Sequence, residues 1–193
     1  GTCLVGSEMC IRDRYKFLSV SKPMVRLLGS GAILNECLKA HEILKQFDIS
    51  SEVWSVTSFN MLRKDGMEIE NANLKNPSKT PQASYVEQSF AHENIPAVAA
   101  TDYMRAYAEQ IRPFVKGTYL TLGTDGFGRS DSRKKLREYF EVDANNIAAT
   151  AAYALLQDQT IDKKQVGKIY EKLGINKDKS CLLYTSDAAD ERR

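Results

Sequence analysis

Short apolar segments alternate with stretches of helical spacing along this chain, and this alternation limits the possible folds more than any other feature. Ala32–Phe47 shows the helical pattern, with apolar residues recurring every three or four positions. Four apolar runs have the composition of buried strands: 24–31 (MVRLLGSG), 51–58 (SEVWSVTS), 96–101 (PAVAAT) and 117–123 (GTYLTLG). Because strands that alternate with helices usually form a parallel sheet covered by helices, the sequence predicts an α/β fold, a three-layer sandwich with a mostly parallel central sheet.

The segments between and after these strands read mainly as helices. Helical patterns occur at 58–75, 102–115, 144–157 and 163–173. Ser58 is a suitable N-cap for the first of them. Asn76–Ser84 is polar and interrupted by proline, as expected of a loop. The next segment, SYVEQSF at 84–90, is compatible with either a strand or a helix.

The two ends of the chain do not continue the patterns beside them. MCIRDR, near the N-terminus, can be encoded by DNA whose reverse complement encodes CLLYT, with which the segment 181–193 begins. We therefore expect residues 1–14 and 181–193 to be translated adapter sequence rather than native protein, and we place a single domain at residues 15–180.

Composition excludes several classes of protein. The formal net charge is +2, which is too small to indicate a nucleic-acid-binding protein. No apolar run approaches the roughly 20 residues of a membrane span, so no membrane association is expected. Cys37 is the only cysteine outside the two ends, so we expect neither a disulfide framework nor a cysteine metal site. A reduced, cytoplasmic protein fits this composition.

Few residues resemble catalytic groups. Gly29–Gly31 could present N–H groups to a phosphate, but Leu34 stands where a dinucleotide fingerprint has its third glycine, so a tight turn is favoured. His41 is expected to be exposed on its helix, and His92 to be a surface residue. Cys37 lies on the apolar face of the helix that carries His41 and is expected to be buried. We therefore assign no catalytic, cofactor-binding or metal-binding residue.

The most distinctive segment is the glycine-rich loop after the last predicted strand. Its candidate residues are Asp125, Gly126, Phe127, Gly128, Arg129, Ser130 and Asp131. An aromatic ring between two glycines, flanked by an arginine and matching carboxylates, suits a subunit interface. Ser130 or Asp131 is a suitable N-cap for the helix that follows. The alternative, a turn whose aspartates bind their own backbone, has about equal weight.

A second candidate is the start of the helix predicted at 102–115. Asp102 and Arg105 are three residues apart and can pair locally, and Tyr103 lies between them. A carboxylate also stabilises a helix N-terminus, so a capping role for Asp102 is at least as well supported as a functional one.

Five blocks of the sequence resemble the C-terminal domain of the homodimeric pyruvate dehydrogenase E1 component, a member of the transketolase-like, thiamine diphosphate-dependent superfamily. The blocks are VRLLGSGAILNECLKAHEIL, SEVWSVTSFNMLRKDG, SYVEQSF, VAATDYMRAYAEQIRPFV and TYLTLGTDGFGRSDSRKKLREYFEVD. ATDYMRA and LGTDGFGRSDSR are long, unbroken and specific. The resemblance covers most of the chain from Met24 onward and is loose over Tyr15–Pro23.

The resemblance implies a parent enzyme that decarboxylates pyruvate on thiamine diphosphate with Mg²⁺ and then reductively acetylates the lipoyl group of its E2 partner, a dihydrolipoyl acetyltransferase. In this family the cofactor ligands lie mainly in upstream domains, so this fragment alone is expected to bind no cofactor and to be inactive.

The same resemblance implies partners for the two candidate segments. The upstream E1 domains, a second E1 subunit of the homodimer and E2 are expected, with Asp102–Arg105 and Asp125–Asp131 at an interface or at the active-site rim. Two alternatives are a stand-alone flavodoxin-like binding module and a non-catalytic domain that docks E2.

Overall fold

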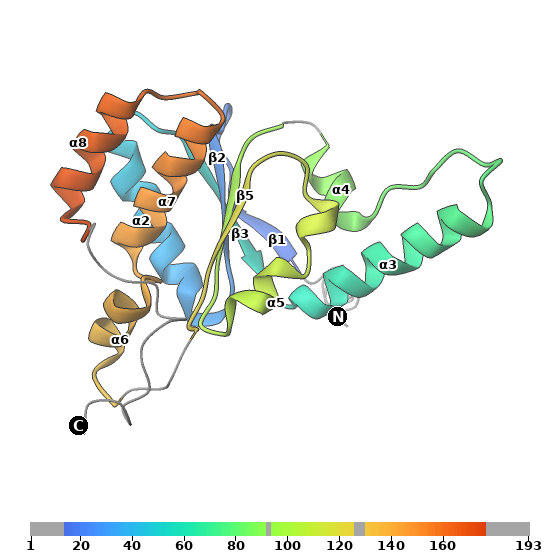
Figure 1. The fold of residues 1–193 in the computed structure, drawn as a ribbon, viewed down its shortest axis with the longest axis horizontal. Coiled ribbons are helices and arrows are strands. Elements are labelled where there is room, and N and C mark those ends of the chain that lie inside the picture. The colour runs from blue at the N-terminus through green and yellow to red at the C-terminus, as the bar shows by residue number, and fades with distance from the viewer. Residues whose placement is uncertain (1–13, 92–93, 126–129, 177–193) are drawn as a thin grey trace, which may run out of the picture.

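The chain forms a central sheet with helices on both faces (Figure 1). The computed structural model describes residues 14–91, 94–125 and 130–176. The strands are β1 (Arg14–Leu18), β2 (Val25–Gly29), β3 (Ser51–Val56), β4 (Ala97–Ala100) and β5 (Tyr119–Leu122). The helices are η1 (Gly31–Ile33), α2 (Leu34–Lys45), α3 (Phe59–Lys75), α4 (Tyr85–Phe90), α5 (Arg105–Glu109), η2 (Arg112–Phe114), α6 (Arg133–Phe140), α7 (Ala144–Gln157) and α8 (Lys163–Leu173).

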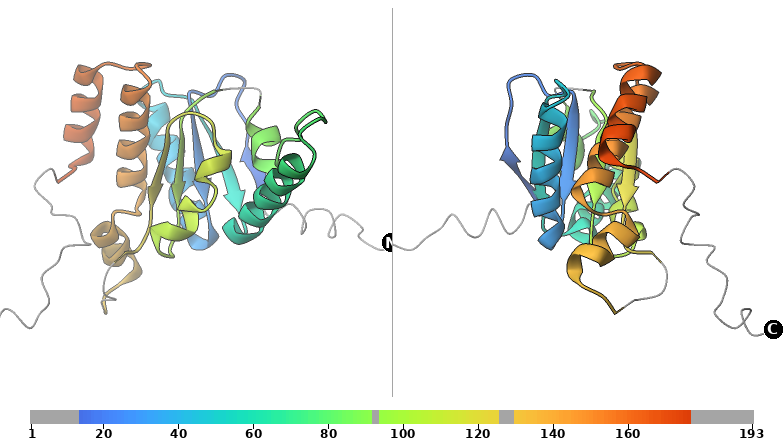
Figure 2. Two further views of the ribbon diagram at one scale, coloured as in Figure 1. Left: turned by 45° about the vertical axis from the view of Figure 1, so that its right-hand side comes forward. Right: turned by 90° about the vertical axis from the view of Figure 1, so that its left-hand side faces the viewer.

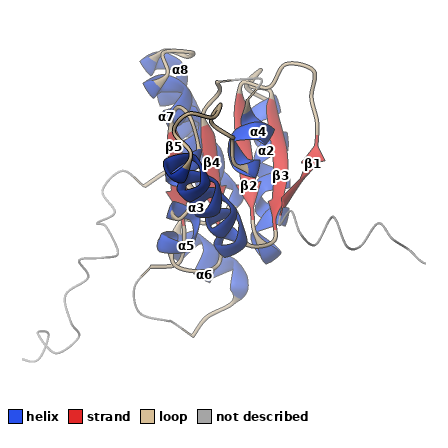
Figure 3. Ribbon diagram, turned by 90° about the vertical axis from the view of Figure 1, so that its right-hand side faces the viewer, coloured by secondary structure: helices blue, strands red, loops and turns tan. Residues whose placement is uncertain are grey.

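The strand order in the sheet is β1-β3-β2-β4-β5, and the four strands β2 to β5 are parallel. Helices α2, α7 and α8 cover one face, while α3, α4 and α5 cover the other (Figures 2 and 3). The predicted α/β fold with a mostly parallel sheet is therefore confirmed. None of the helices in the described ranges is long and apolar enough to cross a membrane.

The two faces of the sheet have separate apolar cores because successive strand residues point to opposite sides. Leu27, Val53 and Val98 pack beneath α2 and α7, whereas Leu28 and Trp54 pack beneath α4 and α5. Strands β2, β3 and β4 are buried along their whole length. Burial on both faces explains why their sequences are continuous apolar runs instead of alternating patterns.

Strand β1 was not predicted from the sequence. It runs antiparallel to β3 at the edge of the sheet, and Lys16 places its Nζ 2.6 Å from Oε2 of the buried Glu52. Arg26 donates to Oε1 of the same carboxylate at 2.7 Å, and Trp54 Nε1 donates to it at 2.8 Å. The signal in the sequence was Glu52 itself, because a charge inside an otherwise apolar strand needs partners of opposite charge.

One segment left open by the sequence is a helix, and one predicted helix begins later than expected. Ser84–Phe90 is helical after Ser84, whose hydroxyl accepts from Glu87 N while Glu87 accepts from Ser84 N, a capping box. The helix predicted at 102–115 begins later, at Arg105, and is followed by the separate turn η2 that contains Pro113. Proline lacks the N–H that would continue the helical ladder, which explains the break.

Candidate functional site

The candidate site lies at the carboxyl edge of the sheet, between β2 and β4. These strands are neighbours, but the chain continues from β2 to β3 on one side and from β4 to β5 on the other. In a parallel sheet this point, where the strand order reverses, leaves an opening between the loops that follow the two strands. Ser30 follows β2 and Thr101 follows β4, and the Ser30 hydroxyl donates to Thr101 Oγ1 at 2.8 Å. Both hydroxyls are buried, so this hydrogen bond joins the two loops.

The Gly29–Gly31 segment is a tight turn, as predicted. A Cβ at Gly29 would lie 2.7 Å from Leu34 Cα, closer than side-chain atoms pack, and Gly31 has a φ of +53°. The carboxylate of Asp102 faces this turn, 3.6 Å from where a Cβ of Gly31 would stand. These glycines therefore let η1 and the start of α2 lie close to the end of β2.

The loop after β5 is bonded to the loop after β4. Thr124 N donates to Tyr103 O at 2.9 Å, and the Thr124 hydroxyl donates to Asp102 O at 2.7 Å. Asp125 Oδ1 accepts from Arg105 N at 3.0 Å, at the first residue of α5. Arg105 Nε also lies 3.9 Å from Asp125 Oδ2. The two predicted candidate segments, at 102–105 and from 125 onward, therefore meet although they are 20 residues apart.

Gly123 makes this junction possible. A Cβ at this position would lie 2.6 Å from Arg105 N and 2.7 Å from Tyr103 O, both of which are backbone atoms. Any side chain would push the two loops apart, because backbone atoms at the start of a helix cannot rotate away as a side chain can.

An exposed apolar surface lies beside the junction. We call Tyr103, Met104 and Tyr107 the edge patch; their exposed fractions are 62%, 55% and 37%. The two tyrosine rings are in contact, with centroids 5.4 Å apart. The backbone beneath Tyr103 is fixed by Thr124, so the patch is held in place without being covered. Exposed aromatic clusters on a fixed backbone are typical of interaction surfaces.

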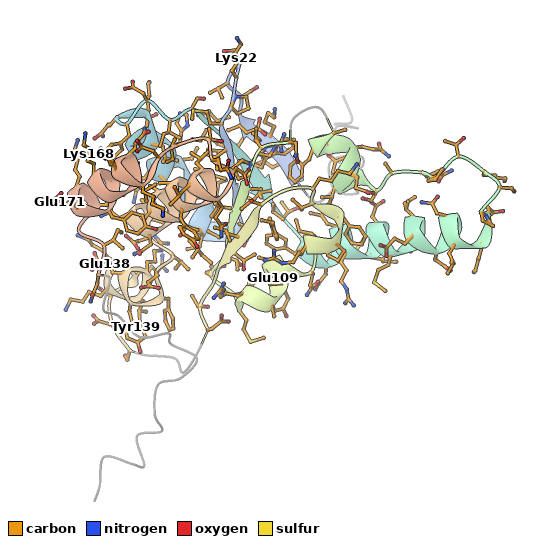
Figure 4. The ribbon with its side chains drawn as sticks, turned by 45° about the horizontal axis from the view of Figure 1, so that its top comes forward. Lys22, Glu109, Glu138, Tyr139, Lys168 and Glu171 are labelled. Atoms are coloured by element: carbon orange, nitrogen blue, oxygen red, sulfur yellow. The ribbon has the colours of Figure 1, made fainter. Side chains whose placement is uncertain are left out.

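Glu109 at the other end of α5 is fully engaged by its neighbours (Figure 4). Arg112 donates from Nε to Glu109 Oε2 at 2.5 Å and from Nη2 to Oε1 at 2.8 Å, and the Thr121 hydroxyl also donates to Oε1. The hydrogen bonds from Arg112 outweigh partial burial and, with that from Thr121, hold the pKa of Glu109 below its ordinary value. Glu109 is therefore ionised and paired at neutral pH, and it is not suited to general acid–base work.

The predicted loop residues have mixed outcomes. Gly126, Phe127, Gly128 and Arg129 lie outside the described residues, as does His92. The N-cap of α6 is Ser132, whose hydroxyl accepts from Lys135 N at 3.4 Å, so the prediction of Ser130 or Asp131 was wrong by one or two positions. Asp131 instead accepts from Ser132 N at 2.6 Å. Ser130 is exposed.

Arg105 and His41 also differ from expectation. Within the described residues the Arg105 guanidinium approaches Asp125, from a different loop, and not its near neighbour Asp102. His41 was expected to be exposed, but it is buried, and its Nδ1 lies 2.9 Å from the hydroxyl of Ser51. The strand beneath α2 supplies that partner, which sequence spacing does not reveal.

Cys37 is buried, as predicted. Burial, and secondarily the charge of Glu36, raise the pKa of the Cys37 thiol to about 12. The thiolate is the nucleophilic form, so this cysteine is not suited to nucleophilic catalysis at neutral pH. Sequence reasoning missed Thr101, Tyr107 and Thr124 as site residues. The available signal for Thr101 was its position directly after the buried strand β4.

Within 14–91, 94–125 and 130–176, no three His, Cys, Asp or Glu side chains lie together in a way that could hold a metal ion. Mg²⁺ is usually held by carboxylates together with phosphate oxygens. The arrangement at the carboxyl edge consists of three hydroxyls, two carboxylates and an exposed aromatic surface: Ser30, Thr101 and Thr124, Asp102 and Asp125, and the edge patch.

Comparisons with known proteins identify the family. The model of the transketolase-like C-terminal domain matches residues 14–143. The pyruvate dehydrogenase E1 component of Pseudomonas aeruginosa is 48% identical over 157 residues, covering 80% of this chain and 18% of that protein. The E1 component of Escherichia coli K12 is 46% identical over 179 residues, covering 90% and 20%.

Solved structures agree on the fold. A transketolase from Pichia stipitis superposes with a TM-score of 0.55 and 15% sequence identity, covering 80% of this chain and 20% of the transketolase chain. The chain spans about a fifth of the length of the curated relatives it matches. It therefore belongs to the family of transketolase-like C-terminal domains, and its sequence matches that of pyruvate dehydrogenase E1 components.

Proposed function

We propose that this chain is the C-terminal domain portion of a pyruvate dehydrogenase E1 polypeptide and that it supplies interface and active-site-rim structure to that enzyme. The observation that supports this most directly is the sequence similarity to two E1 components. The chain is 48% identical to one over 157 residues and 46% identical to the other over 179 residues. The whole enzyme would decarboxylate pyruvate and reductively acetylate the lipoyl group of E2. Its relatives are bacterial, and we place it in the bacterial cytoplasm.

Thiamine diphosphate and Mg²⁺ would supply the carbanion chemistry when bound in the parent enzyme. The described residues offer no metal-ligand cluster, so no step through these groups is assigned to them. Their contribution is positional. Ser30, Thr101 and Thr124 fix the loops after three strands, and Asp125 fixes the start of α5. A fixed edge keeps neighbouring residues in place and excludes water from the surface it covers.

The edge patch is the proposed contact surface. Tyr103, Met104 and Tyr107 project from the braced junction, and Asp125 accepts a hydrogen bond from Arg105 N beside them. Aromatic and methionine side chains surrounded by polar groups are common at the centres of protein interfaces. The partners would be the upstream E1 domains and the second E1 subunit of a homodimer, with E2 as the partner of the assembled enzyme. The isolated chain would be inactive.

A domain exchange tests this proposal. Residues 15–176 would replace the matching region of the Escherichia coli E1 component, which is 46% identical. The chimera is expected to catalyse pyruvate-dependent acetylation of the E2 lipoyl group, whereas the isolated 193-residue chain is expected to show none. E1 lacking the region serves as the negative control. A chimera that folds and dimerises but has no more activity than this truncated enzyme would contradict the proposal.

A further inference from the structure

We propose that residues 67–84, the outer half of α3 and the segment that returns from it, form a docking arm for the upstream part of the same E1 polypeptide. The inference rests on the proposed function, because it requires that the domain belongs to a longer chain. It concerns a different surface from the edge patch, because the docking arm includes the outer half of α3 and the edge patch lies at α5.

The docking arm projects beyond the rest of the domain. In Figure 1, α3 runs away from the sheet, and in Figure 4 the side chains along its outer half stand clear of the other helices and strands. The buried residues of α3 are Phe59, Leu62 and Gly66, all in its first eight positions. Beyond them, Met67 is 50% exposed and Leu74 is 79% exposed. Since tertiary packing supplies most helical stability, a projecting half-helix with exposed apolar residues is expected to pack on something else.

Met67 and Leu74 lie on one side of the helix. They are seven residues apart, which is two helical turns, and Asn71 lies between them on the same side. A shallow hollow runs along this side, and its lining residues are Asn60, Arg63, Lys64, Met67, Glu68 and Asn71. The surface therefore combines two apolar side chains with amide and charged groups, a composition typical of contacts between domains of one chain.

The docking arm is braced internally and is not a fraying end. Asn73 Nδ2 donates to Gln82 O at 2.8 Å, and Gln82 N donates to Asn73 Oδ1 at 2.8 Å. Asn76 Nδ2 donates to Ala72 O at 3.1 Å. At the base, Tyr85 N donates to Asp65 Oδ2 at 2.7 Å. These bonds order the return segment before any partner binds, which lowers the entropic cost of docking.

The path of the chain indicates which partner covers the docking arm. Arg14, the first described residue, pairs with Val56 at the end of β3, and α3 begins at Phe59, three residues later. In a longer chain of the proposed kind, the polypeptide that precedes β1 would enter beside the base of α3. This chain covers only about a fifth of the E1 components that it matches, so much of their length lies outside it.

Interface size favours the same polypeptide over a second copy. A stable complex between separate molecules usually buries about 1,200 Å² or more, and two exposed apolar side chains offer little toward that area. Docking within one chain needs less, because covalent linkage holds the partner at an effective concentration of about millimolar or higher. The small apolar stripe on the docking arm suits an intramolecular partner.

Amide hydrogen exchange tests the inference. The rates at 67–82 would be compared between the isolated 193-residue chain and the Escherichia coli chimera. We expect these amides to exchange about tenfold or more slowly in the chimera. The double substitution M67R/L74R is expected to abolish that protection in the chimera and to leave the unfolding temperature of the isolated chain unchanged. Tyr153→Arg is the matched control: Tyr153 is also exposed, but it lies on α7, across the sheet.

The outcomes separate this inference from the proposed function. An active chimera with unprotected amides at 67–82 would overturn the docking arm and leave the proposed function standing. An inactive chimera with protection that M67R/L74R removes would support the docking arm while contradicting the proposed function. Protection that appears in the isolated chain as its concentration rises, together with a dimer in analytical ultracentrifugation, would identify a second copy as the occupant and overturn the inference.

Discussion

The two faces of the sheet differ in how completely the helices cover their apolar residues. On the face covered by α2, α7 and α8, helix α7 buries six alanines, Ala144, Ala148, Ala149, Ala151, Ala152 and Ala154. Small side chains let α7 lie close to both α2 and the sheet, and α8 covers its other side (Figure 2). On the opposite face the core is aromatic, with Trp54, Phe90 and Phe114, and the helices above it are short or projecting.

This difference separates a face whose apolar residues are covered within the domain from a face that leaves several of them exposed. The face with the aromatic core, which we call the aromatic face, leaves large apolar residues exposed on α3, on α5 and directly before α5: Met61, Met67, Leu74, Tyr103, Met104 and Tyr107. The face covered by α2, α7 and α8, which we call the alanine face, leaves the large side chain of Tyr153 exposed. A face that buries its apolar residues within the domain needs no partner, whereas one that leaves several exposed is expected to be covered by another protein surface.

The largest predicted effect contrasts one leucine from each face. Leu155→Ala on α7 removes a fully buried side chain and is expected to lower the free energy of unfolding by about 2–5 kcal/mol, because it leaves a cavity. Leu74→Ala on α3 is expected to change it by less than about 0.5 kcal/mol, since Leu74 is almost fully exposed. Urea denaturation of the two variants measures both values. Equal losses would remove the distinction between the faces.

A second prediction concerns the buried charges that hold β1 on the sheet. Glu52→Gln is expected to destabilise the domain by about 3 kcal/mol at pH 7, because it removes the carboxylate that faces Arg26 and Lys16 in the interior. Lys16→Met is the matched comparison and should cost less, since Lys16 is partly exposed whereas Glu52 is not. Destabilisation of Lys16→Met equal to that of Glu52→Gln would show that the edge strand carries the effect.

The same carboxylate predicts a dependence on pH. Burial favours a higher pKa for Glu52, but hydrogen bonds from Lys16 and Trp54 and the charges of Lys16 and Arg26 outweigh it and lower the pKa. A lowered pKa contributes stability above the ordinary carboxylate range, and this contribution is lost as pH falls through the folded-state value. The difference in unfolding free energy between wild type and Glu52→Gln should therefore shrink in acid. A difference that stays constant from pH 7 to pH 3 would contradict this assignment.

Local patterns in the sequence predicted most of the fold, because apolar periodicity depends on the same faces that the sheet buries. The strands at Val25–Gly29 and Ala97–Ala100 and the helices α3 and α7 follow directly from composition and spacing. Strand β1 could not be predicted in this way, because its pairing depends on Lys16 reaching Glu52, 36 residues away. The side chain of His41 likewise depends on Ser51, a partner supplied by the tertiary structure.

The candidate site was predictable in part. The two segments were found because glycines and charges at the ends of buried strands stand out, but their mutual contact was not. Asp125 caps α5 from another loop, so the helix begins at Arg105 and leaves Asp102 outside it. A cap supplied across 20 residues leaves no trace in local spacing, so the sequence offered only a local pair between Asp102 and Arg105 or a cap from Asp102.

A further prediction tests how closely the two loops pack at Gly123. Gly123→Ala is expected to cost about 1–3 kcal/mol, because the new Cβ would meet Arg105 N and Tyr103 O at less than 3 Å. Gly167→Ala on α8 is the matched control: nothing lies within 4 Å of its added Cβ, and a helical alanine replaces glycine there. That control is expected to stabilise by about 0.5–1 kcal/mol. Equal effects on unfolding would mean that the junction yields without strain.

The smallest predicted effect separates the two contacts of Asp125. Asp125→Ala removes both the acceptor for Arg105 N and the ion pair, and it is expected to cost about 1 kcal/mol, as the loss of a helix cap usually does. Arg105→Ala removes only the ion pair, whose atoms are 3.9 Å apart and whose arginine is half exposed, so about 0.5 kcal/mol or less is expected. Urea denaturation of the two variants and of the double variant measures the coupling. If Arg105→Ala cost as much as Asp125→Ala, the ion pair and not the cap would hold the carboxyl edge together. The edge patch would then be sensitive to salt, unlike the alanine face across the sheet, which is held by apolar packing.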